Sequence, residues 1–364
     1  MEVVINGNEY KHGEDDEAGV LALAACLSHT FPMALAAAID LDLFEIISGA
    51  GDGARMSASD IAAQLPSAAD GAAPVLDAML QLLASHSLLI CSTNVLADGG
   101  GGAVERRYGI APAGKFFVKD ESGVSFAQFH SIVRKGGEIG FSLKDAVIEG
   151  GNQFEKICAK SFYEFITSNV EATKMFNDGM RAHSSVIIKK VVKTYKGFEG
   201  LSCLVDVGGG SGSSLDTIIS KYPSIRGVNF DLPHVVETAP TYNGIEHIGG
   251  DMFVEVPNGD AILLKFILHN WGDEQCGNLL KNCYKSLPNN GKLIVMDYIL
   301  PNTHQDDIHA KYASQMNLTM SCFLEGKERT KEEFEGMAKK AGFGEFKVVC
   351  YVYGMWVMEF IKLV

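Results

Sequence analysis

A buried-strand pattern that runs into a glycine-rich loop is the feature that most limits how this chain folds. Residues 204–212 read LVDVGGGSG, an apolar, β-branched run with one acidic residue, followed by glycines. Such a run is typical of a parallel strand, and glycine suits a loop that turns with positive φ or lies against a ligand. A helix expected over residues 213–222 directs its N-terminal dipole at the same place. The pattern predicts a doubly wound α/β domain with a nucleotide-like cofactor at this loop.

Length and charge narrow the class of protein. The chain has 364 residues, enough for two domains, and its 47% hydrophobic and 21% charged residues are typical of a globular protein. A net charge of −14 disfavours a broad phosphate-binding surface and therefore a nucleic-acid partner. The eight cysteines contain no C-x-x-C pair, so neither a zinc site nor a small disulfide framework is expected.

The first residues do not resemble a targeting segment. Residues 1–18 are polar and acidic, and we expect a flexible tail without the basic and apolar regions of a signal peptide. No apolar run reaches the length of a membrane span. We therefore expect a soluble, cytoplasmic protein with no membrane partner.

Residues 19–118 have the pattern of a winged-helix-like domain. The expected helices are followed by two short strands, with Pro32 as a breaker between the first two helices. These helices span residues 22–29, 34–47, 57–65 and 74–85, and the strands lie near residues 88–91 and 107–110. Residues 74–85 contain no Arg or Lys, which argues against DNA binding and for dimerisation or covering of a substrate.

Residues 119–364 are expected to form the larger domain. Helices are predicted over residues 162–167, 173–180 and 184–195. Strands are predicted over residues 203–207, 227–230, 261–266, 292–298, 346–353 and 356–362. Helices between most of the strands indicate βαβ units on a parallel sheet, and the last two strands give it an antiparallel end.

The glycine loop leaves two cofactors open. The dinucleotide fingerprint is G-x-G-x-x-G. Counted from Gly208 or Gly210, its third glycine position is occupied here by Ser213 or Leu215, so the sequence lacks the motif for a nicotinamide cofactor. S-adenosylmethionine has no pyrophosphate and does not need that glycine. It needs a carboxylate for its ribose, and Asp231 stands at the end of the next strand, about 20 residues on. Residues 250–253 follow a further strand and are placed to hold the adenine.

Five motifs in order then carry a family resemblance. They are LVDVGGGSG (204–212), GVNFDLPHV (227–235), GGDMF (249–253), LLKFILHNWGDE (263–274) and GKERT (326–330). The chain resembles the plant small-molecule O-methyltransferases of the caffeic acid and alkaloid type over nearly its whole length. The resemblance implies a Rossmann-like α/β methyltransferase domain, an N-terminal helical dimerisation domain, a homodimer, S-adenosylmethionine as donor and S-adenosylhomocysteine as product. The cofactor contacts it implies are Gly208, Asp231, Asp251, Met252 and Lys265.

Methyl transfer to a phenol needs a base that removes the phenolic proton. His269 follows a predicted strand at the carboxyl edge of the sheet, where sites of this architecture form, and it is our candidate. Asp297 and Glu328 match the family positions that flank this histidine, although the family commonly has Glu where this chain has Asp297. We expect no metal, because the sulfonium supplies its own leaving group and the sequence shows no evident His/Asp/Glu ligand cluster.

The resemblance also implies an acceptor pocket. Its residues are Phe176, Met180, His183, Phe266, Met316, Met320 and Leu324. Lignin-pathway relatives carry Trp at Phe266, Asn at Leu324 and Phe at Ala172, so the pocket here is larger and less polar. We expect a benzylisoquinoline or protoberberine alkaloid phenol of the scoulerine type; the alternative is a caffeic acid, phenylpropanoid or flavonoid acceptor. A nicotinamide oxidoreductase and a winged-helix DNA-binding regulator are the remote alternatives.

Overall fold

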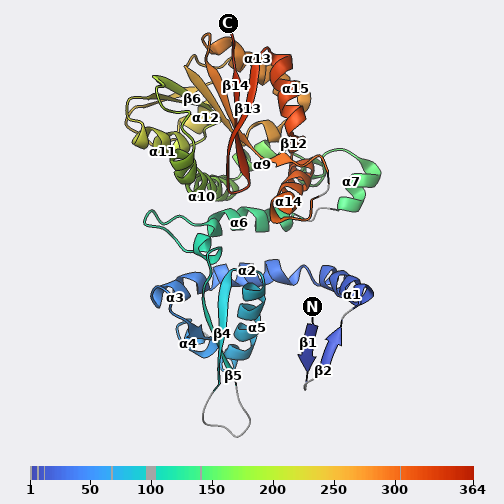
Figure 1. The fold of residues 1–364 in the computed structure, drawn as a ribbon. Coiled ribbons are helices and arrows are strands. Elements are labelled where there is room, and N and C mark those ends of the chain that lie inside the picture. Colours follow the sequence, from blue (N-terminus) through green and yellow to red (C-terminus); the bar gives the residue numbers. More distant parts are fainter. Residues whose placement is uncertain are drawn as a thin grey trace. The chain divides into compact units, whose positions relative to one another are not determined.

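The computed structural model describes residues 2–5, 8–11, 13–66, 69–95, 104–139, 142–303 and 305–364. The chain forms two compact units, Met1–His130 and Ser131–Val364 (Figure 1). This division falls inside helix α6 (Phe126–Gly137), later than the boundary at residues 118 and 119 expected from the sequence.

The N-terminal residues are more ordered than expected. Strands β1 (Glu2–Ile5) and β2 (Asn8–Lys11) pair in antiparallel fashion, and helix α1 (Glu14–Cys26) begins directly afterwards. The expectation of a tail that runs to residue 18 is therefore wrong. Four acidic residues in the first turn of α1 complement the positive end of the helix dipole, and Asp16 Oδ2 accepts the N–H of Gly13 at 3.1 Å. The charge run begins a helix and does not keep the chain unfolded.

The first unit packs helices on a small sheet. Its further helices are α2 (Thr30–Asp40), α3 (Leu43–Gly49), α4 (Ala58–Ala62) and α5 (Ala72–Ser85), with a 3-10 turn at Gly114–Phe117. Strands β3 (Met56–Ser57), β5 (Val104–Ile110) and β4 (Leu89–Val95) lie in that order. Ile61, Leu80, Leu83 and Tyr108 are fully buried in its core.

Two local expectations for this unit are wrong. Pro32 does not interrupt a helix; it lies in the first turn of α2, where its missing N–H has no partner to lose. The helix expected over residues 34–47 is divided by Asp42, whose φ of 51° ends one helix and starts the next. The helix predicted at residues 57–65 is present as α4, with Ser57 as its N-cap.

The second unit begins with helices α7 (Leu143–Glu149), α8 (Gln153–Cys158), α9 (Phe162–Ser168) and α10 (Val170–Thr194). The sequence predicted two helices where α10 is one helix of 25 residues. His183 and Ser184, which stand at the expected break, are buried polar residues within it. The N-cap Asn169 accepts the N–H of Ala172 at 3.0 Å.

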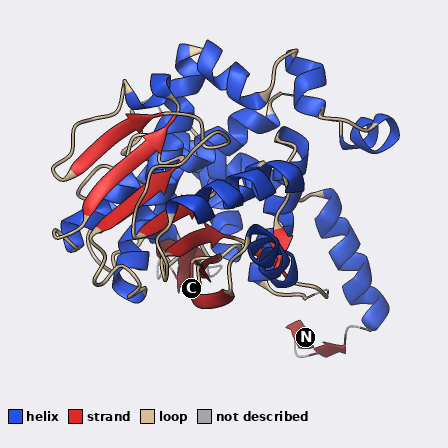
Figure 2. Cartoon of the chain, turned by 90° about the horizontal axis from the view of Figure 1, so that it is seen from above, coloured by secondary structure: helices blue, strands red, loops and turns tan. Residues whose placement is uncertain are grey.

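A seven-stranded sheet, whose strands are red in Figure 2, forms the centre of the second unit. Its strand order is β13-β14-β10-β9-β6-β7-β8. Its strands are β6 (Cys203–Val207), β7 (Arg226–Asp231), β8 (Ile245–Gly249), β9 (Ala261–Lys265), β10 (Lys292–Asp297), β13 (Glu345–Val352) and β14 (Met355–Ile361). β14 runs antiparallel to β10 and β13, and the other pairs are parallel. The predicted parallel sheet with an antiparallel end is confirmed.

Helices cover both faces of this sheet. Helices α13 (Asp273–Ser286) and α15 (Lys331–Ala341) pack on one face, with α10 and α11 (Ser213–Lys221) on the other. Alternate residues of β6, such as Val205 and Leu204, enter the two cores, as strands buried on both faces require. Further elements of this unit are α12 (Pro233–Val236), β11 (Ile299–Leu300), α14 (Ile308–Phe323) and β12 (Arg329–Thr330).

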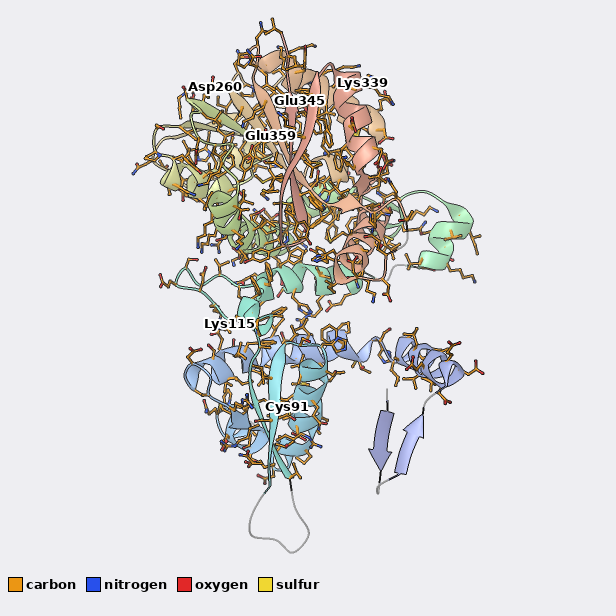
Figure 3. All side chains as sticks on the ribbon, in the orientation of Figure 1. Cys91, Lys115, Asp260, Lys339, Glu345 and Glu359 are labelled. Atoms are coloured by element: carbon orange, nitrogen blue, oxygen red, sulfur yellow. The ribbon has the colours of Figure 1, made fainter. Side chains whose placement is uncertain are left out.

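One polar cluster explains the charged residue within strand β14. Glu359, labelled in Figure 3, accepts hydrogen bonds from the Tyr195 hydroxyl and, at 2.8 Å, from Lys292 Nζ. Three elements are thereby joined through one carboxylate.

Among the described helices, none by itself has the length and apolar composition to cross a bilayer; α1 and α2 meet those two criteria only as a pair, bent by 49°.

Candidate active site

The glycine loop is fixed to the end of strand β7. Gly208, Gly210 and Gly212 have φ values of 71°, 58° and 80°, in the left-handed region that favours glycine. The N–H of Gly210 donates to Asp231 Oδ2 at 2.8 Å, and Asn229 Nδ2 donates to the carbonyl of Gly210 at 2.9 Å. A Cβ at Gly209 would collide with the side chains of Asn229 and Asp206. The structure thus places the glycine loop beside Asp231, and the N–H of Gly208 donates to the carbonyl of Phe230, the residue before Asp231, at 2.8 Å.

Asp231 is held as an acceptor. Each of its oxygens accepts one backbone N–H, from Gly210 and, at 2.7 Å, from Leu232. Burial raises the pKa of Asp231, and these two hydrogen bonds oppose the increase. Each carboxylate oxygen accepts more than one hydrogen bond, so capacity for a ligand hydroxyl remains. Asp251 follows the neighbouring strand β8; it is exposed, and its Oδ1 accepts the N–H of Phe253 at 2.8 Å.

Lys265 links the cofactor loop to the base. It ends β9, its Nζ donates to Ser184 Oγ at 2.7 Å, and it lies 4.7 Å from the centre of the Phe266 ring. Burial lowers the pKa of Lys265 to about 8, although Asp206 and Asp297 favour its charged form. Burial also raises the pKa of Asp206 to about 7. A buried cation and two buried acids therefore lie between the glycine loop and His269.

His269 forms the predicted cluster with both carboxylates. It lies in a 3-10 turn (Leu268–Asn270) after β9, and its Nδ1 is 2.8 Å from Glu328 Oε1 and 3.7 Å from Asp297 Oδ1. The three residues are only 6%, 1% and 0% exposed, in the order His269, Glu328, Asp297. Glu328 is therefore the hydrogen-bonding partner, and Asp297 lies beyond hydrogen-bond distance.

The arrangement fixes the tautomer of the imidazole. An ionised carboxylate only accepts, so Nδ1 carries the proton toward Glu328 and Nε2 is left as the acceptor. Burial alone would lower the pKa of His269, but Asp297 and Glu328 outweigh it and the pKa is raised. Burial raises the pKa of Asp297 to about 7, and His269 opposes this. The site is a buried base held by one acid and faced by a second.

One sequence expectation about this cluster is wrong. The sequence showed no evident His/Asp/Glu ligand cluster, yet ligand atoms of His269, Asp297 and Glu328 all lie within 4.8 Å of one another. These residues are 28 and 31 positions apart along the chain, so no local spacing reveals them. A cation of suitable size fits such a donor set, which makes metal removal a necessary control for any assay.

The pocket residues do not all lie against the base. The centre of the Phe266 ring lies 5.1 Å from that of His183 and 5.5 Å from that of His269. The backbone of Phe266 has a φ of 56°. Burial lowers the pKa of His183 to about 3, so it is neutral beside His269. Phe176 instead joins a cluster through Phe162, at 5.6 Å. The other four are half-buried on or at the end of α10 and α14, and no described polar or ring contact joins them to His269: Met180, Met316, Met320 and Leu324.

Several residues around the site were missed from the sequence. Tyr163 stacks on Trp271 at 5.9 Å, and Trp271 meets Phe253 edge-on at 4.9 Å. Burial and, to a smaller extent, the charge of Asp231 raise the pKa of Tyr163. Trp271 lies two residues after His269 in the LHNWGDE motif, so the motif held the only signal.

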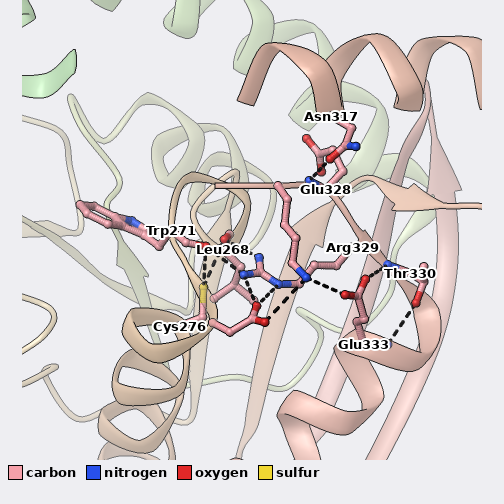
Figure 4. A network of polar contacts seen from close by, with 10 residues as sticks. Leu268, Trp271, Cys276, Asn317, Glu328, Arg329, Thr330 and Glu333 are labelled. Carbon is pink, nitrogen blue, oxygen red and sulfur yellow. Dashed lines mark hydrogen bonds and ion pairs between the residues drawn. The ribbon is translucent and has the colours of Figure 1, made fainter. Parts of the chain in front are cut away.

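Arg329 was missed as well. Its guanidinium is fully buried and donates to the carbonyl oxygens of Leu268 and Trp271, at 2.7 and 2.9 Å (Figure 4). These two residues bracket His269 in the sequence. The GKERT motif contains Arg329, but only Glu328 was taken from it, because the carbonyl partners lie 58 and 61 positions away.

The fold and the site together define a class of protein. A seven-stranded sheet with one antiparallel strand, a glycine loop after β6 and an acid after β7 is the architecture of Rossmann-like S-adenosylmethionine-dependent methyltransferases. Human N-acetylserotonin methyltransferase in complex with S-adenosylmethionine has this fold, with a TM-score of 0.75 at 21% identity, over 97% of this chain and 100% of that one. CalO1, a methyltransferase in calicheamicin biosynthesis solved in its S-adenosylhomocysteine-bound form, gives 0.72 at 21% identity, over 96% and 99%.

Sequence comparison assigns the family. Residues 141–344 match the O-methyltransferase domain, and residues 23–120 match the O-methyltransferase dimerisation domain. O-methyltransferase 13 of Lophophora williamsii is 49% identical over 96% of both chains. Caffeic acid 3-O-methyltransferase of Prunus dulcis is 48% identical over 96% of this chain and 95% of its own. The chain belongs to the plant O-methyltransferase family and is an S-adenosylmethionine-dependent O-methyltransferase, as the resemblance indicated.

Proposed function

We propose that this enzyme methylates a phenolic hydroxyl of a small plant aromatic compound, with His269 as the general base. The observation that carries the proposal is the 2.8 Å hydrogen bond between His269 Nδ1 and Glu328 Oε1, in a buried site at the edge of the sheet. It leaves Nε2 as the acceptor for a phenolic proton. Asp297 stabilises the imidazolium by its charge and Glu328 by charge and hydrogen bond.

The chemistry follows from this arrangement. S-adenosylmethionine supplies an electrophilic methyl group on a sulfonium that is its own leaving group. The phenolic oxygen forms the new O–CH₃ bond as the S–CH₃ bond breaks, and His269 Nε2 takes the phenolic proton. Full proton transfer in the ground state, from a phenol with pKa near 10 to an imidazole near 6.5, costs about 5 kcal/mol. The raised pKa of His269 reduces this cost.

We propose the cofactor contacts Gly208, Asp231, Asp251, Met252 and Lys265. Three features support the fit: glycines without room for a Cβ, spare acceptor capacity on Asp231, and the exposed Asp251 at the next strand end. In this proposal Asp231 holds the ribose and residues 250–253 hold the adenine. The aromatic side chains of Tyr163, Trp271 and Phe253 lie beside these groups and would exclude water from them.

For the acceptor we favour a phenylpropanoid of the caffeic acid type. Relatives named caffeic acid 3-O-methyltransferases, from Prunus dulcis and Medicago sativa, match at 48% and 46% identity. This supports the alternative acceptor of the sequence analysis better than the scoulerine-type alkaloid. Phe266, Leu324 and Ala172, where the chain departs from lignin-pathway relatives, make a larger phenol the second candidate.

The assay is mass spectrometry with S-adenosylmethionine and a panel of caffeate, flavonoid and benzylisoquinoline phenols. His269→Ala is expected to abolish turnover while retaining cofactor affinity by calorimetry. His309→Ala, on the exposed start of α14, is the matched histidine control and should keep wild-type turnover. Turnover retained by His269→Ala would refute the base, and methylation of alkaloid phenols alone would reverse the order of acceptors.

We also propose that the enzyme is a homodimer. Helix α1 has no buried residue, and Val20, Leu21 and Leu23 are 65%, 73% and 67% exposed. Such an apolar helix face marks an interaction surface, and it overlaps the start of the dimerisation-domain match at residue 23. Light scattering should give twice the mass of the chain for wild type and a single chain for Leu23→Glu. A monomeric wild type would refute the proposal.

A further inference from the structure

We propose that Arg329 is a positioning residue that holds His269, Glu328 and Asp297 in one arrangement through the backbone of the segments that carry them. This inference rests on the proposed role of His269 as the base. Arg329 forms no described hydrogen bond with the three side chains. Its charge opposes the increase that burial causes in the pKa of Asp297, and its hydrogen bonds go to the backbone beside His269 and to Asp273.

The first link is to the turn that carries His269. Arg329 Nη1 donates to the Leu268 carbonyl at 2.7 Å, and Nη2 donates to the Trp271 carbonyl at 2.9 Å. Its Nε and Nη2 both donate to Asp273 Oδ1, at 3.2 and 2.9 Å. One planar group therefore fixes the residues on both sides of His269 and the first residue of α13. The imidazole has little freedom to rotate away with its backbone.

The second link is to the two acids. Glu328 directly precedes Arg329 in the chain. Strand β12 pairs in parallel with β11, with Arg329 opposite Ile299, and Ile299 lies two residues after Asp297. A shift of Arg329 relative to the His269 turn would therefore move both carboxylates relative to the imidazole.

Two further contacts hold the segment that carries Glu328 in place. Asn317 Oδ1 accepts the N–H of Glu328 at 3.0 Å, which ties the acid to helix α14. Gly326 packs so closely on the His269 turn that a Cβ there would collide with the carbonyl of His269. The separation of His269 from Glu328 is thus also set by contacts of the segment that precedes Arg329.

Arginine is needed at this position for its shape. A lysine keeps the charge but presents a single nitrogen, which cannot reach both carbonyls and Asp273 in one plane. Arg329→Lys should therefore rescue only part of what Arg329→Met loses. A misplacement of about 1 Å at a reacting group lowers the rate by about 10²-fold, and we expect a loss of that order in kcat for Arg329→Met.

The test compares Arg329→Met, Arg329→Lys and the control Lys331→Gln. Lys331 is two residues away and exposed at the start of α15, so its variant should retain wild-type kcat. For Arg329→Met we expect a kcat about 10²-fold lower, S-adenosylmethionine affinity within about twofold of wild type, and an intermediate kcat for Arg329→Lys.

The pH profile separates positioning from general support of the fold. His269 is faced by Asp297 and Glu328, by Lys265 from β9 and by His183 from α10. When the acids move away, the acid limb of kcat/KM should shift to lower pH. A protein that is only partly folded would lose amplitude and keep the limb in place.

Asp273→Asn covers the case in which Arg329→Met fails to fold. It weakens the guanidinium's only described ion pair, at an exposed carboxylate, and should lower kcat by a smaller factor with the same direction of pH shift. Wild-type kcat and pH limb in folded Arg329→Lys and Asp273→Asn would overturn the proposal. His269→Ala, run in parallel, tests the base independently: if it stays active the proposed function fails, whatever Arg329 does.

Discussion

The two acids beside His269 should stabilise its protonated form in different ways, and the loss of kcat on substitution of each acid measures the difference. Glu328 Oε1 lies 2.8 Å from Nδ1, whereas Asp297 Oδ1 lies 3.7 Å from it. Glu328 therefore acts by a hydrogen bond and by charge, and Asp297 by charge alone. Glu328→Gln removes the charge and keeps an acceptor; Glu328→Ala removes both; Asp297→Asn removes only a charge that forms no hydrogen bond.

The expected sizes follow from these differences. A hydrogen bond to a charged group contributes about 1.5–3 kcal/mol, and a neutral one about 0.5–1.5 kcal/mol. Glu328→Ala should therefore lower kcat by about 10- to 150-fold, and Glu328→Gln by about tenfold, at about 1.4 kcal/mol per factor of ten. Asp297→Asn should lower kcat by a smaller factor than either Glu328 variant, because no hydrogen bond is lost.

The pH dependence has a definite sign. Burial by itself lowers the pKa of His269, but Asp297 and Glu328 raise this pKa by more than burial lowers it, so the net shift is upward. Loss of either negative charge lowers this pKa, and because the base acts in its neutral form, the acid limb of kcat/KM must move to lower pH. Asp297→Asn is thus expected to shift the limb with little change of kcat above it.

The assay is steady-state kinetics between pH 5 and 9 on the best phenol of the panel. Glu325→Gln is the matched control, because Glu325 is an exposed carboxylate in the same segment. The reasoning is refuted if Asp297→Asn lowers kcat more than Glu328→Ala, or if the limb of either variant moves to higher pH.

Three further outcomes are expected. Turnover after dialysis against EDTA should equal that of untreated enzyme, and recovery by an added divalent cation would show that the acid cluster holds a metal. Gly209→Ala should weaken S-adenosylmethionine binding by calorimetry, because its Cβ collides with Asn229 and Asp206. Burial raises the pKa of Asp206 from 3.8 to about 7, so its ionisation costs stability progressively as pH rises through that interval. Asp206→Asn should therefore raise Tm more at pH 8 than at pH 4, and an equal gain at both would contradict this.

The sheet was predictable where burial dictates residue type. Strands β6, β9 and β10 are apolar on both faces, and their observed bounds differ from the predicted ones by a residue or less. The break predicted between residues 180 and 184 of α10 was wrong. His183 and Ser184 are polar, but both are buried within the continuous helix. Ser184 is buried there by its hydrogen bond to Lys265, which periodicity cannot show. Tertiary partners, not local propensity, decide such positions.

The site was predictable as far as motifs reached. His269 and Glu328 were identified from their motifs and Asp297 from a matching family position. Which acid orients the base, however, depends on a difference of 0.9 Å between two separations, 2.8 and 3.7 Å. Asp297 has the shorter side chain, and Glu328 stands directly before β12, so the difference depends on where the fold places that short strand. Neither Arg329 nor Tyr163 carries a local signal, because their partners are set by the tertiary fold.

The origin of Glu328 explains why the base needs support outside the sheet. Gly208, Asp231, Lys265 and Asp297 each end or follow a strand of the main sheet, whose register holds them at one edge. Glu328 does not; it arrives with β12, which joins only the two-residue strand β11. The acid in direct contact with the base is therefore the one that the core of the sheet does not position. A short pair of strands is weak by itself, so the fixed contacts of Arg329, Asn317 and Gly326 supply the rigidity that the base requires.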